Sequence, residues 1–177
     1  MTVGIVGAGR IGRAVLERLK PFGVKLVYNQ RHQLPADYER NLGATYFPDV
    51  RELAKVVDVA VLEVPLYAAT RHLFDASVIA TMRRGAYIVN NGSGELVDRD
   101  AIVDALNSGQ LAGYAGDVWY PQPAPADHPW RTMPHEGMTP HISGTTLSAQ
   151  SRYAAGTREI LEDFLDDEPI RDEYIIA

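Results

Sequence analysis

The sequence of 177 residues contains no cysteine, and this absence removes several kinds of chemistry at once. Disulfide bridges, thiol catalysis and thiolate metal sites are excluded, and the composition suits a reducing compartment such as the cytoplasm. The five histidines do not show the spacing of metal ligands, so the sequence predicts no metal site. We therefore expect a cytoplasmic protein whose chemistry does not depend on a metal ion.

The chain also lacks an excess of positive charge. It has 17 Lys and Arg against 23 Asp and Glu, a formal net charge of -6, so the electrostatic footprint of a nucleic-acid-binding protein is missing. Its longest apolar stretch, residues 56–66, is interrupted by Asp58 and Glu63 and is too short to span a bilayer. No basic segment followed by an apolar run marks a signal peptide. We expect neither a nucleic acid nor a membrane as a partner.

Short apolar segments alternate with amphipathic ones along most of the chain. This alternation predicts an α/β fold: a doubly wound parallel sheet of the Rossmann type, with helices on both faces, three layers and a single lobe. Strands are predicted at residues 2–6, 25–28, 59–63, 86–90 and 113–117, with a short closing strand near 138–139. Helices are predicted at residues 10–20, 50–57, 75–82, 98–108 and 146–167.

Residues 120–137 interrupt this alternation because they contain five prolines. Proline fixes φ and has no backbone N–H, so the segment cannot form a regular helix or strand. A loop of this length is usually functional or disordered. The total length is sufficient for one domain with a real core, so residues 1–177 are predicted to be one domain, with residues 146–177 as its C-terminal helix and tail.

The segment 7–12 reads GAGRIG and matches the pattern G-x-G-x-x-G, directly after a predicted strand and at the start of a predicted helix. In that context Gly7 permits a tight turn, Gly9 lets backbone N–H groups approach a pyrophosphate, and Gly12 lets the helix pack close to the sheet. The helix N-terminus then favours the anion, with Arg10 and Ile11 at its first turn. The pattern predicts a dinucleotide-binding domain. The alternative is a glycine-rich turn without a ligand.

The end of the second predicted strand bears on which dinucleotide is bound. Many dinucleotide sites carry Asp or Glu there to bind the adenosine ribose hydroxyls, whereas this chain has Gln30, Arg31 and His32. A carboxylate would repel a 2′-phosphate, but Gln30 would not, and Arg31 and His32 are positioned to attract one. We therefore expect NAD or NADP as coenzyme, with NADP tolerated or preferred. An exposed polar loop with no bearing on the coenzyme is the alternative.

Four later segments resemble NAD-dependent formate dehydrogenases, a branch of the D-2-hydroxyacid dehydrogenases. They are residues 84–90 (RGAYIVN), 111–125 (LAGYAGDVWYPQPAP), 127–134 (DHPWRTMP) and 138–146 (MTPHISGTT). The resemblance extends over nearly the whole chain but concerns only the cofactor-binding lobe of that family. The N-terminal catalytic lobe of the family would precede Met1 and is expected to be absent from this chain.

The resemblance implies roles for several residues. His141 would orient formate and stabilise its charge, held by the amide of Gln122, and Asp117 would bind the nicotinamide carboxamide unless it serves only as a turn cap. Ser143 and Gly144 would line the nicotinamide, and Pro65 the adenosine side of the groove. An acid beside the histidine is unnecessary for formate, because hydride transfer yields carbon dioxide with no hydroxyl proton to remove. The glutamine therefore favours formate over 2-hydroxy acids.

Three positions depart from the family. Where the family has an arginine that binds the substrate carboxylate in two parallel hydrogen bonds, this chain has Ser93, and Glu95 nearby would repel formate. Loss of such a group costs about two to four kcal/mol in the transition state. At Glu63 the family tends to have a neutral amide, and at Tyr67 a histidine.

Three functions remain open from the sequence. The chain is the NAD(P)-binding domain of a formate dehydrogenase-like oxidoreductase, alone or with a partner that supplies the other lobe. Alternatively, it is a non-catalytic NAD(P)-binding relative, as Ser93 and the missing lobe favour. The third possible function is that of a D-2-hydroxyacid dehydrogenase, and Gln122 argues against it. By analogy with the family, we expect a homodimer, and formate or another small carboxylate as substrate.

Overall fold

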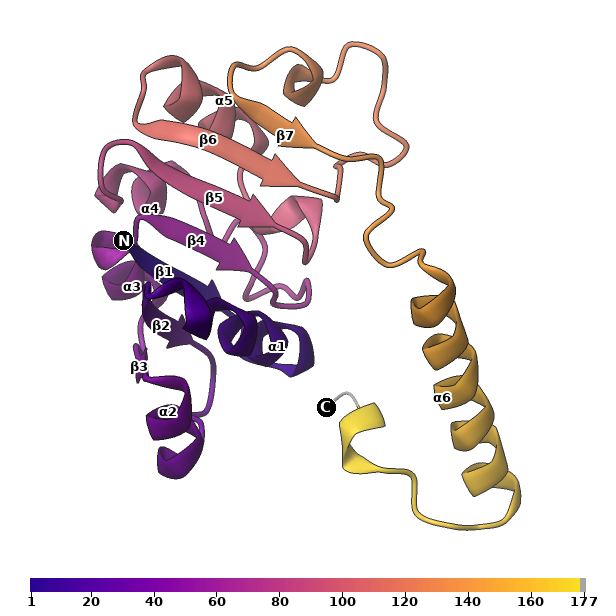
Figure 1. The fold of residues 1–177 in the computed structure, drawn as a ribbon. Coiled ribbons are helices and arrows are strands. Elements are labelled where there is room, and N and C mark those ends of the chain that lie inside the picture. The colour runs from indigo at the N-terminus through magenta and orange to yellow at the C-terminus, as the bar shows by residue number, and fades with distance from the viewer. Residues whose placement is uncertain (176–177) are drawn as a thin grey trace. The chain divides into compact units, whose positions relative to one another are not determined.

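The computed structural model describes residues 1–175 and divides into two compact units, Met1–Pro140 and a second that begins at His141. The first unit contains a seven-stranded parallel sheet in the order β3-β2-β1-β4-β5-β6-β7 (Figure 1). The strands are β1 (Thr2–Val6), β2 (Lys25–Asn29), β3 (Ala44–Tyr46), β4 (Val59–Leu62), β5 (Ala86–Asn90), β6 (Leu111–Gly116) and β7 (Glu136–Met138). The first six follow the Rossmann order, so the predicted fold class is confirmed.

The helices of the first unit connect these strands. They are α1 (Arg10–Leu19), α2 (Ala36–Leu42), α3 (Val50–Val56), α4 (Ala76–Thr81) and α5 (Arg99–Asn107). Each predicted helix and strand is found within a few residues of its expected bounds. The sequence did not predict α2 or β3, which form the connection from β2 to the sheet edge, nor the short 3₁₀ helices at Lys20–Phe22, Gly94–Leu96 and Pro129–Arg131.

Two hydrophobic cores lie on opposite faces of the sheet and give the unit its three layers. One core packs Leu16 of α1 and Leu42 of α2 against β1 and β2. The other packs α3, α4 and α5 against β1, β2, β4, β5 and β6, with Ile79 and Ile102 almost fully buried. A strand covered on both faces needs apolar side chains at successive positions, which explains why β1 is buried at all five of its residues.

The cover on the α1 side does not extend over the whole sheet. The faces of β5, β6 and β7 line an open hollow of about 320 Å³, where Tyr87 is 49% exposed and Val89, Ala115 and His135 form the walls. Within the first unit, the helical cover on the α1 side therefore lies over β1 and β2 and leaves this hollow beside β5, β6 and β7.

The register of the sheet places the ends of six strands in one row. Val6 pairs with Asn29 on one side and with Leu62 on the other, Leu62 pairs with Asn90, Asn90 with Gly116, and Gly116 with Met138. The residues that follow these strands therefore lie side by side along the carboxyl edge. This is the edge where open α/β sheets bind their ligands.

The second unit is built on α6 (Leu147–Leu165), whose N-terminus is capped by Thr146. The 3₁₀ helix at Asp172–Tyr174 returns to α6, where the Tyr174 hydroxyl donates to Glu159 at 3.0 Å and Arg171 pairs with the same carboxylate at 2.5 Å. The predicted long helix is confirmed. In the part of the chain that the structure describes, no helix is both long and apolar enough to cross a membrane.

Candidate functional site

The turn between β1 and α1 depends on glycine at two positions. Gly7 has φ +100, and its N–H donates to the Asn29 carbonyl at 2.8 Å. A Cβ atom at Gly12 would lie 2.1 Å from the Gly7 carbonyl oxygen, far inside van der Waals contact. Gly9 differs, because a Cβ atom there would meet nothing within 4 Å. The protein therefore fills the space behind the turn and leaves the space in front of Gly9 open.

The N-terminus of α1 is open to an anion. Gly9 at the N-cap provides no side-chain hydrogen bond, and the first turn contains no acidic residue. By contrast, Asp49, Asp75 and Asp98 cap the N-termini of α3, α4 and α5 with side-chain oxygens. Unpaired N–H groups together with the helix dipole attract a phosphate at this position. Arg10 and Ile11 are both exposed at this turn.

The end of β2 carries no carboxylate, as the sequence indicates. The Asn29 amide donates to the carbonyls of Phe47 and Pro48 and ties β2 to the segment after β3. The Gln30 side chain donates to the carbonyl of His32, and the Gln30 carbonyl accepts from the Tyr46 hydroxyl at 3.1 Å. Arg31 and His32 are exposed to solvent.

The phenol of Tyr28 fixes the start of the loop that follows. It is fully buried, hydrogen-bonds to Glu39 of α2 and accepts from the N–H of Leu34 at 2.9 Å. Burial, together with the neighbouring Glu39 carboxylate, raises the pKa of Tyr28, so this hydroxyl stays protonated. No local pattern in the sequence indicates the contact with Glu39, because Glu39 lies in α2, a helix that the sequence does not predict.

The ends of β4 and β5 meet beside the glycine turn. Glu63 directly follows β4, and its backbone N–H donates to the Val6 carbonyl at 2.8 Å. Its carboxylate accepts from the Asn91 amide at 3.4 Å, and burial raises the pKa of the Glu63 carboxyl. Pro65 is exposed two residues further on, and its carbonyl accepts from Thr70 at 2.7 Å.

Ser93 occupies a turn that Asn90 organises. The buried Asn90 amide donates to the Ser93 carbonyl at 2.7 Å and to the Tyr114 hydroxyl at 3.2 Å. The expectation that Glu95 presents a free repulsive charge is wrong, because its carboxylate pairs with the guanidinium of Arg71. The sequence could not reveal this pair, since the two residues lie 24 positions apart in a turn and a 3₁₀ helix.

Asp117 follows β6 on the same edge and is only 3% exposed. One carboxylate oxygen accepts from the Thr139 hydroxyl at 2.5 Å, and the Asp117 N–H donates to the Asn90 carbonyl at 3.3 Å. A buried carboxylate at the carboxyl edge is the arrangement expected for a ligand-binding residue. Its role toward a coenzyme stays a prediction.

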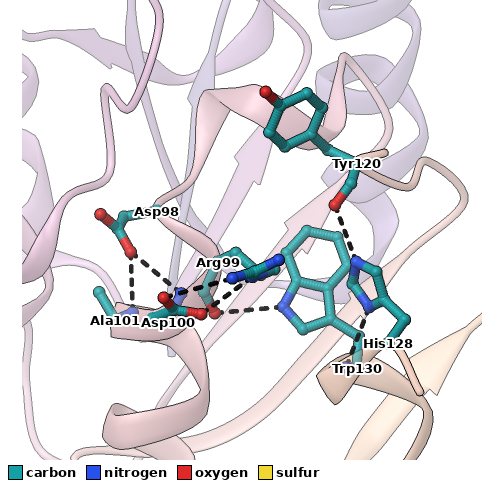
Figure 2. Close-up of polar contacts among 7 residues, drawn as sticks. All are labelled: Asp98, Arg99, Asp100, Ala101, Tyr120, His128 and Trp130. Carbon is teal, nitrogen blue, oxygen red and sulfur yellow. Dashed lines mark hydrogen bonds and ion pairs between the residues drawn. The ribbon is translucent and has the colours of Figure 1, made fainter. Parts of the chain in front are cut away.

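The proline-rich segment after Asp117 is an ordered loop that two aromatic residues anchor (Figure 2). His128 is 2% exposed; its Nε2 hydrogen-bonds to the Tyr120 carbonyl at 2.8 Å and its Nδ1 accepts from the Trp130 N–H at 3.2 Å. The fully buried Trp130 indole donates to the Arg99 carbonyl at 3.3 Å, at the start of α5. Trp130 thus packs in the interior, and the exposed Gln122 lies within this anchored loop.

The predicted site residues divide between the two units. Eleven of the fourteen belong to the first unit, where the carboxyl edge and the loop after β6 carry them: Gly7, Gly9, Arg10, Ile11, Gly12, Gln30, Arg31, His32, Pro65, Asp117 and Gln122. His141, Ser143 and Gly144 open the second unit and are exposed within it, with His141 at φ 60. The pairing of Gln122 with His141 therefore remains a prediction. Within residues 1–175, no cluster of three His, Asp or Glu side chains has a metal-binding arrangement.

A Rossmann sheet with an open glycine turn and an uncapped helix defines the first unit as a dinucleotide-binding domain. The family model for the NAD binding domain of D-isomer specific 2-hydroxyacid dehydrogenases matches residues 1–143. The chain belongs to this family.

Several of the known proteins similar to the chain are formate dehydrogenases. The enzyme of Pseudomonas sp. (strain 101) is 60% identical over 177 residues, which is all of this chain and 44% of the relative. The solved structure of Granulicella m. formate dehydrogenase superimposes with a TM-score of 0.91 at 63% identity, over 100% of this chain and 47% of that one. The NAD-dependent formate dehydrogenase of Staphylococcus aureus, solved in complex with NAD, superimposes with a TM-score of 0.82 at 47% identity. The match covers 99% of this chain and 52% of that one. The chain thus spans about half the length of these relatives.

Proposed function

We propose that this chain is the coenzyme-binding part of an NAD(P)-dependent formate dehydrogenase. The observation that carries the proposal is the 60% identity with a formate dehydrogenase, which extends along all 177 residues and so far beyond the glycine turn. Residues 1–177 would form one dinucleotide-binding domain, of which residues 146–177 are the C-terminal helix and tail. The remaining contacts would come from a separate catalytic lobe.

The residues of the carboxyl edge fit a dinucleotide. Gly7, Gly9 and Gly12, with the first-turn N–H groups at Arg10 and Ile11, would hold the pyrophosphate in the space that the glycines leave open. When bound, the nicotinamide ring would accept a hydride from the substrate. On the nicotinamide side we assign Asp117, Ser143 and Gly144, and on the adenosine side Pro65.

The choice between NAD and NADP would depend on the end of β2. Gln30 places no carboxylate there, the exposed Arg31 offers positive charge to a 2′-phosphate, and the exposed His32 offers a ring nitrogen as a hydrogen-bond donor. The Gln30 side-chain amide donates to the His32 carbonyl, so this neutral side chain places no negative charge in the path of a phosphate toward Arg31. We therefore propose that NADP binds at least as tightly as NAD. Calorimetric titration with each coenzyme tests this, and a tenfold preference for NAD would contradict it.

The proposed substrate is formate. Gln122 and His141 would form the pair that orients it, since a neutral amide beside the histidine suffices when no hydroxyl proton has to move. Ser93 argues against formate as substrate, because a serine cannot form the two parallel hydrogen bonds of a guanidinium with a carboxylate.

A second function follows from Ser93: a non-catalytic NAD(P)-binding relative. Without the guanidinium the chain would bind coenzyme but stabilise the transition state less, by about two to four kcal/mol. A D-2-hydroxyacid dehydrogenase is less consistent with the site, because Gln122 cannot assist His141 as an acid would.

One experiment distinguishes these functions. The purified chain is titrated with NAD and NADP and then incubated with formate, or with glyoxylate and reduced coenzyme, while the absorbance of the reduced nicotinamide is recorded. Formate turnover would support the dehydrogenase, and coenzyme binding without turnover the non-catalytic relative. Formate turnover gained by the Ser93→Arg variant would identify this position as the missing element.

The assembly and location of the protein rest on analogy and composition. We propose a homodimer that forms through the coenzyme-binding domain, as in the family, in the reducing environment of the cytoplasm that the absence of cysteine suits. A monomeric mass in light scattering of the purified chain would contradict the dimer.

A further inference from the structure

The side chain of Arg13 contacts the backbone of the glycine turn. Arg13 lies near the start of α1, and its Nε–H donates to the Ala8 carbonyl at 3.0 Å. Ala8 stands between Gly7 and Gly9 and is fully buried. A buried backbone carbonyl needs a hydrogen-bond partner, and here a side chain provides one. The conformation of the turn therefore depends on Arg13 as well as on the glycines.

The direction of the Ala8 carbonyl fixes the direction of the next N–H. In a planar trans peptide the carbonyl and the N–H point in opposite directions. The Ala8 carbonyl is directed at Arg13, so the Gly9 N–H of the same peptide unit points away from Arg13. Within residues 1–175 this N–H donates to no protein group, and Gly9 is exposed. It is therefore available to the pyrophosphate that we assign to this turn.

A second contact restricts the Arg13 side chain. Its guanidinium carbon lies 5.6 Å from the centre of the Tyr38 ring, a cation–π contact between α1 and α2. The Tyr38 hydroxyl donates to the Glu17 carboxylate at 2.6 Å, which ties the ring back to α1. An exposed arginine loses rotamer entropy when it makes a single hydrogen bond. The ring lowers that cost, because it already limits the positions of the guanidinium.

We infer that Arg13 is a positioning residue that orients the Gly9 N–H toward the pyrophosphate of the coenzyme. Arg13 acts through its hydrogen bond to the Ala8 carbonyl, and not through its charge. The inference rests on the proposed coenzyme function and adds to the site a residue outside the pattern G-x-G-x-x-G.

Two substitutions separate the hydrogen bond from the charge. Arg13→Gln removes the charge but places an amide N–H donor the same number of bonds from Cα as the arginine Nε. Arg13→Met removes the charge and places a methyl group there. Arg18→Met is the matched control, because Arg18 lies on the same helix and donates to the Ala14 carbonyl at 2.9 Å, away from the turn. Arginine, glutamine and methionine have similar helix propensities, so α1 should form in every variant.

Calorimetry measures the dissociation constant and the number of binding sites for NAD, or for NADP if the parent protein prefers it. Arg13→Met should bind about fivefold more weakly, the effect of one lost hydrogen bond, with the number of sites unchanged. Arg13→Gln and Arg18→Met should both bind within about twofold of the parent protein.

Equal weakening in Arg13→Gln and Arg13→Met would overturn the inference, because the charge would then be the cause. Unchanged affinity in both, or the same loss in Arg18→Met as in Arg13→Met, would overturn it as well. So would a reduced number of sites at unchanged affinity in Arg13→Met, which would show a role in folding alone. A parent protein that binds neither NAD nor NADP would instead refute the proposed coenzyme function.

Discussion

Alanine substitutions at Gly9 and Gly12 test the geometry of the glycine turn, because the two positions differ in the space around an added methyl group. A methyl group at Gly12 would lie 2.1 Å from the Gly7 carbonyl oxygen, where ordinary contact begins at 3.4 Å, so backbone atoms must move by more than 1 Å. Overpacking of this kind costs about 1–3 kcal/mol, and the higher helix propensity of alanine returns about 1 kcal/mol. Because the obstacle is backbone, we expect a net loss near the upper end, about 2 kcal/mol.

Gly9→Ala should behave in the opposite way. Gly9 has φ -74, which alanine adopts freely, and its methyl group would meet no protein atom within 4 Å. Folding should lose less than about 1 kcal/mol, the usual difference between glycine and alanine at an N-cap. The methyl group would, however, occupy the space in front of the turn, so we expect coenzyme affinity to fall at least about tenfold, or 1.4 kcal/mol.

Thermal unfolding and calorimetric titration of both variants separate the two effects. For a chain of this size, 1 kcal/mol shifts the Tm by about 2–4 °C, so Gly12→Ala should melt about 4–8 °C lower and Gly9→Ala less than about 4 °C lower. A Gly9→Ala variant that binds coenzyme as tightly as the parent would refute the assignment of that space to the pyrophosphate. A fully stable Gly12→Ala variant would refute the described packing of α1 against the turn.

Three further predictions concern the rest of the first unit. Gln30→Asp should lower NADP affinity at least about tenfold and leave NAD affinity equal or higher, because the new carboxylate repels the 2′-phosphate; titration with both coenzymes measures the ratio. Hydrogen bonds from the Thr2 N–H and the Arg83 guanidinium lower the pKa of the Asp58 carboxyl in the folded protein. The ionised carboxylate therefore stabilises the fold above about pH 3.9, the pKa of Asp in an unfolded chain, and this stabilisation is lost as the pH falls below that value. Asp58→Asn should therefore lose about 1 kcal/mol of stability at pH 7 and show a smaller decline in acid; equal pH profiles would contradict this. His128→Ala should cost about 2–4 kcal/mol in urea unfolding, because it leaves the Tyr120 carbonyl without its buried partner and opens a cavity beside the aromatic cluster; a loss under 1 kcal/mol would show that the anchor is dispensable.

The elements that the sequence predicts well are those whose local pattern and tertiary environment agree. β1 is buried at all five positions because both of its faces are covered, and α1 starts inside the glycine pattern, directly after Gly9. In contrast, β3 has only three residues at the sheet edge, none of them fully buried, so it lacks the apolar run that marks a strand. The short helix α2 precedes it with a single buried residue, Leu42, and no apolar periodicity to detect.

The residues of the candidate site likewise divide into those that local sequence predicts and those that it does not. Glycine positions and strand ends follow from local sequence, because they depend on backbone conformation and on the parallel topology. The contacts that fix the side chains do not: Glu95 is neutralised by Arg71, and Trp130 is tied to the Arg99 carbonyl 31 positions earlier. Such pairs are set by the packing of distant segments, and a single sequence carries no periodic signal for them.

The register shows that Glu63 and Ser93, two positions that differ from the family, lie on neighbouring segments of the carboxyl edge. Both follow strands that are neighbours in the sheet, β4 and β5, and a Cβ atom at the intervening Gly92 would lie 2.6 Å from the Val64 carbonyl oxygen, so the two segments run in contact. One departure adds a negative charge and the other removes a positive charge, so both shift the potential of the same edge in one direction. An edge with that shift in potential is less favourable for a carboxylate. If formate is the substrate, as we propose, the two differences would weaken its binding together, and an arginine restored at position 93 alone would still lie on an edge that carries the Glu63 carboxylate.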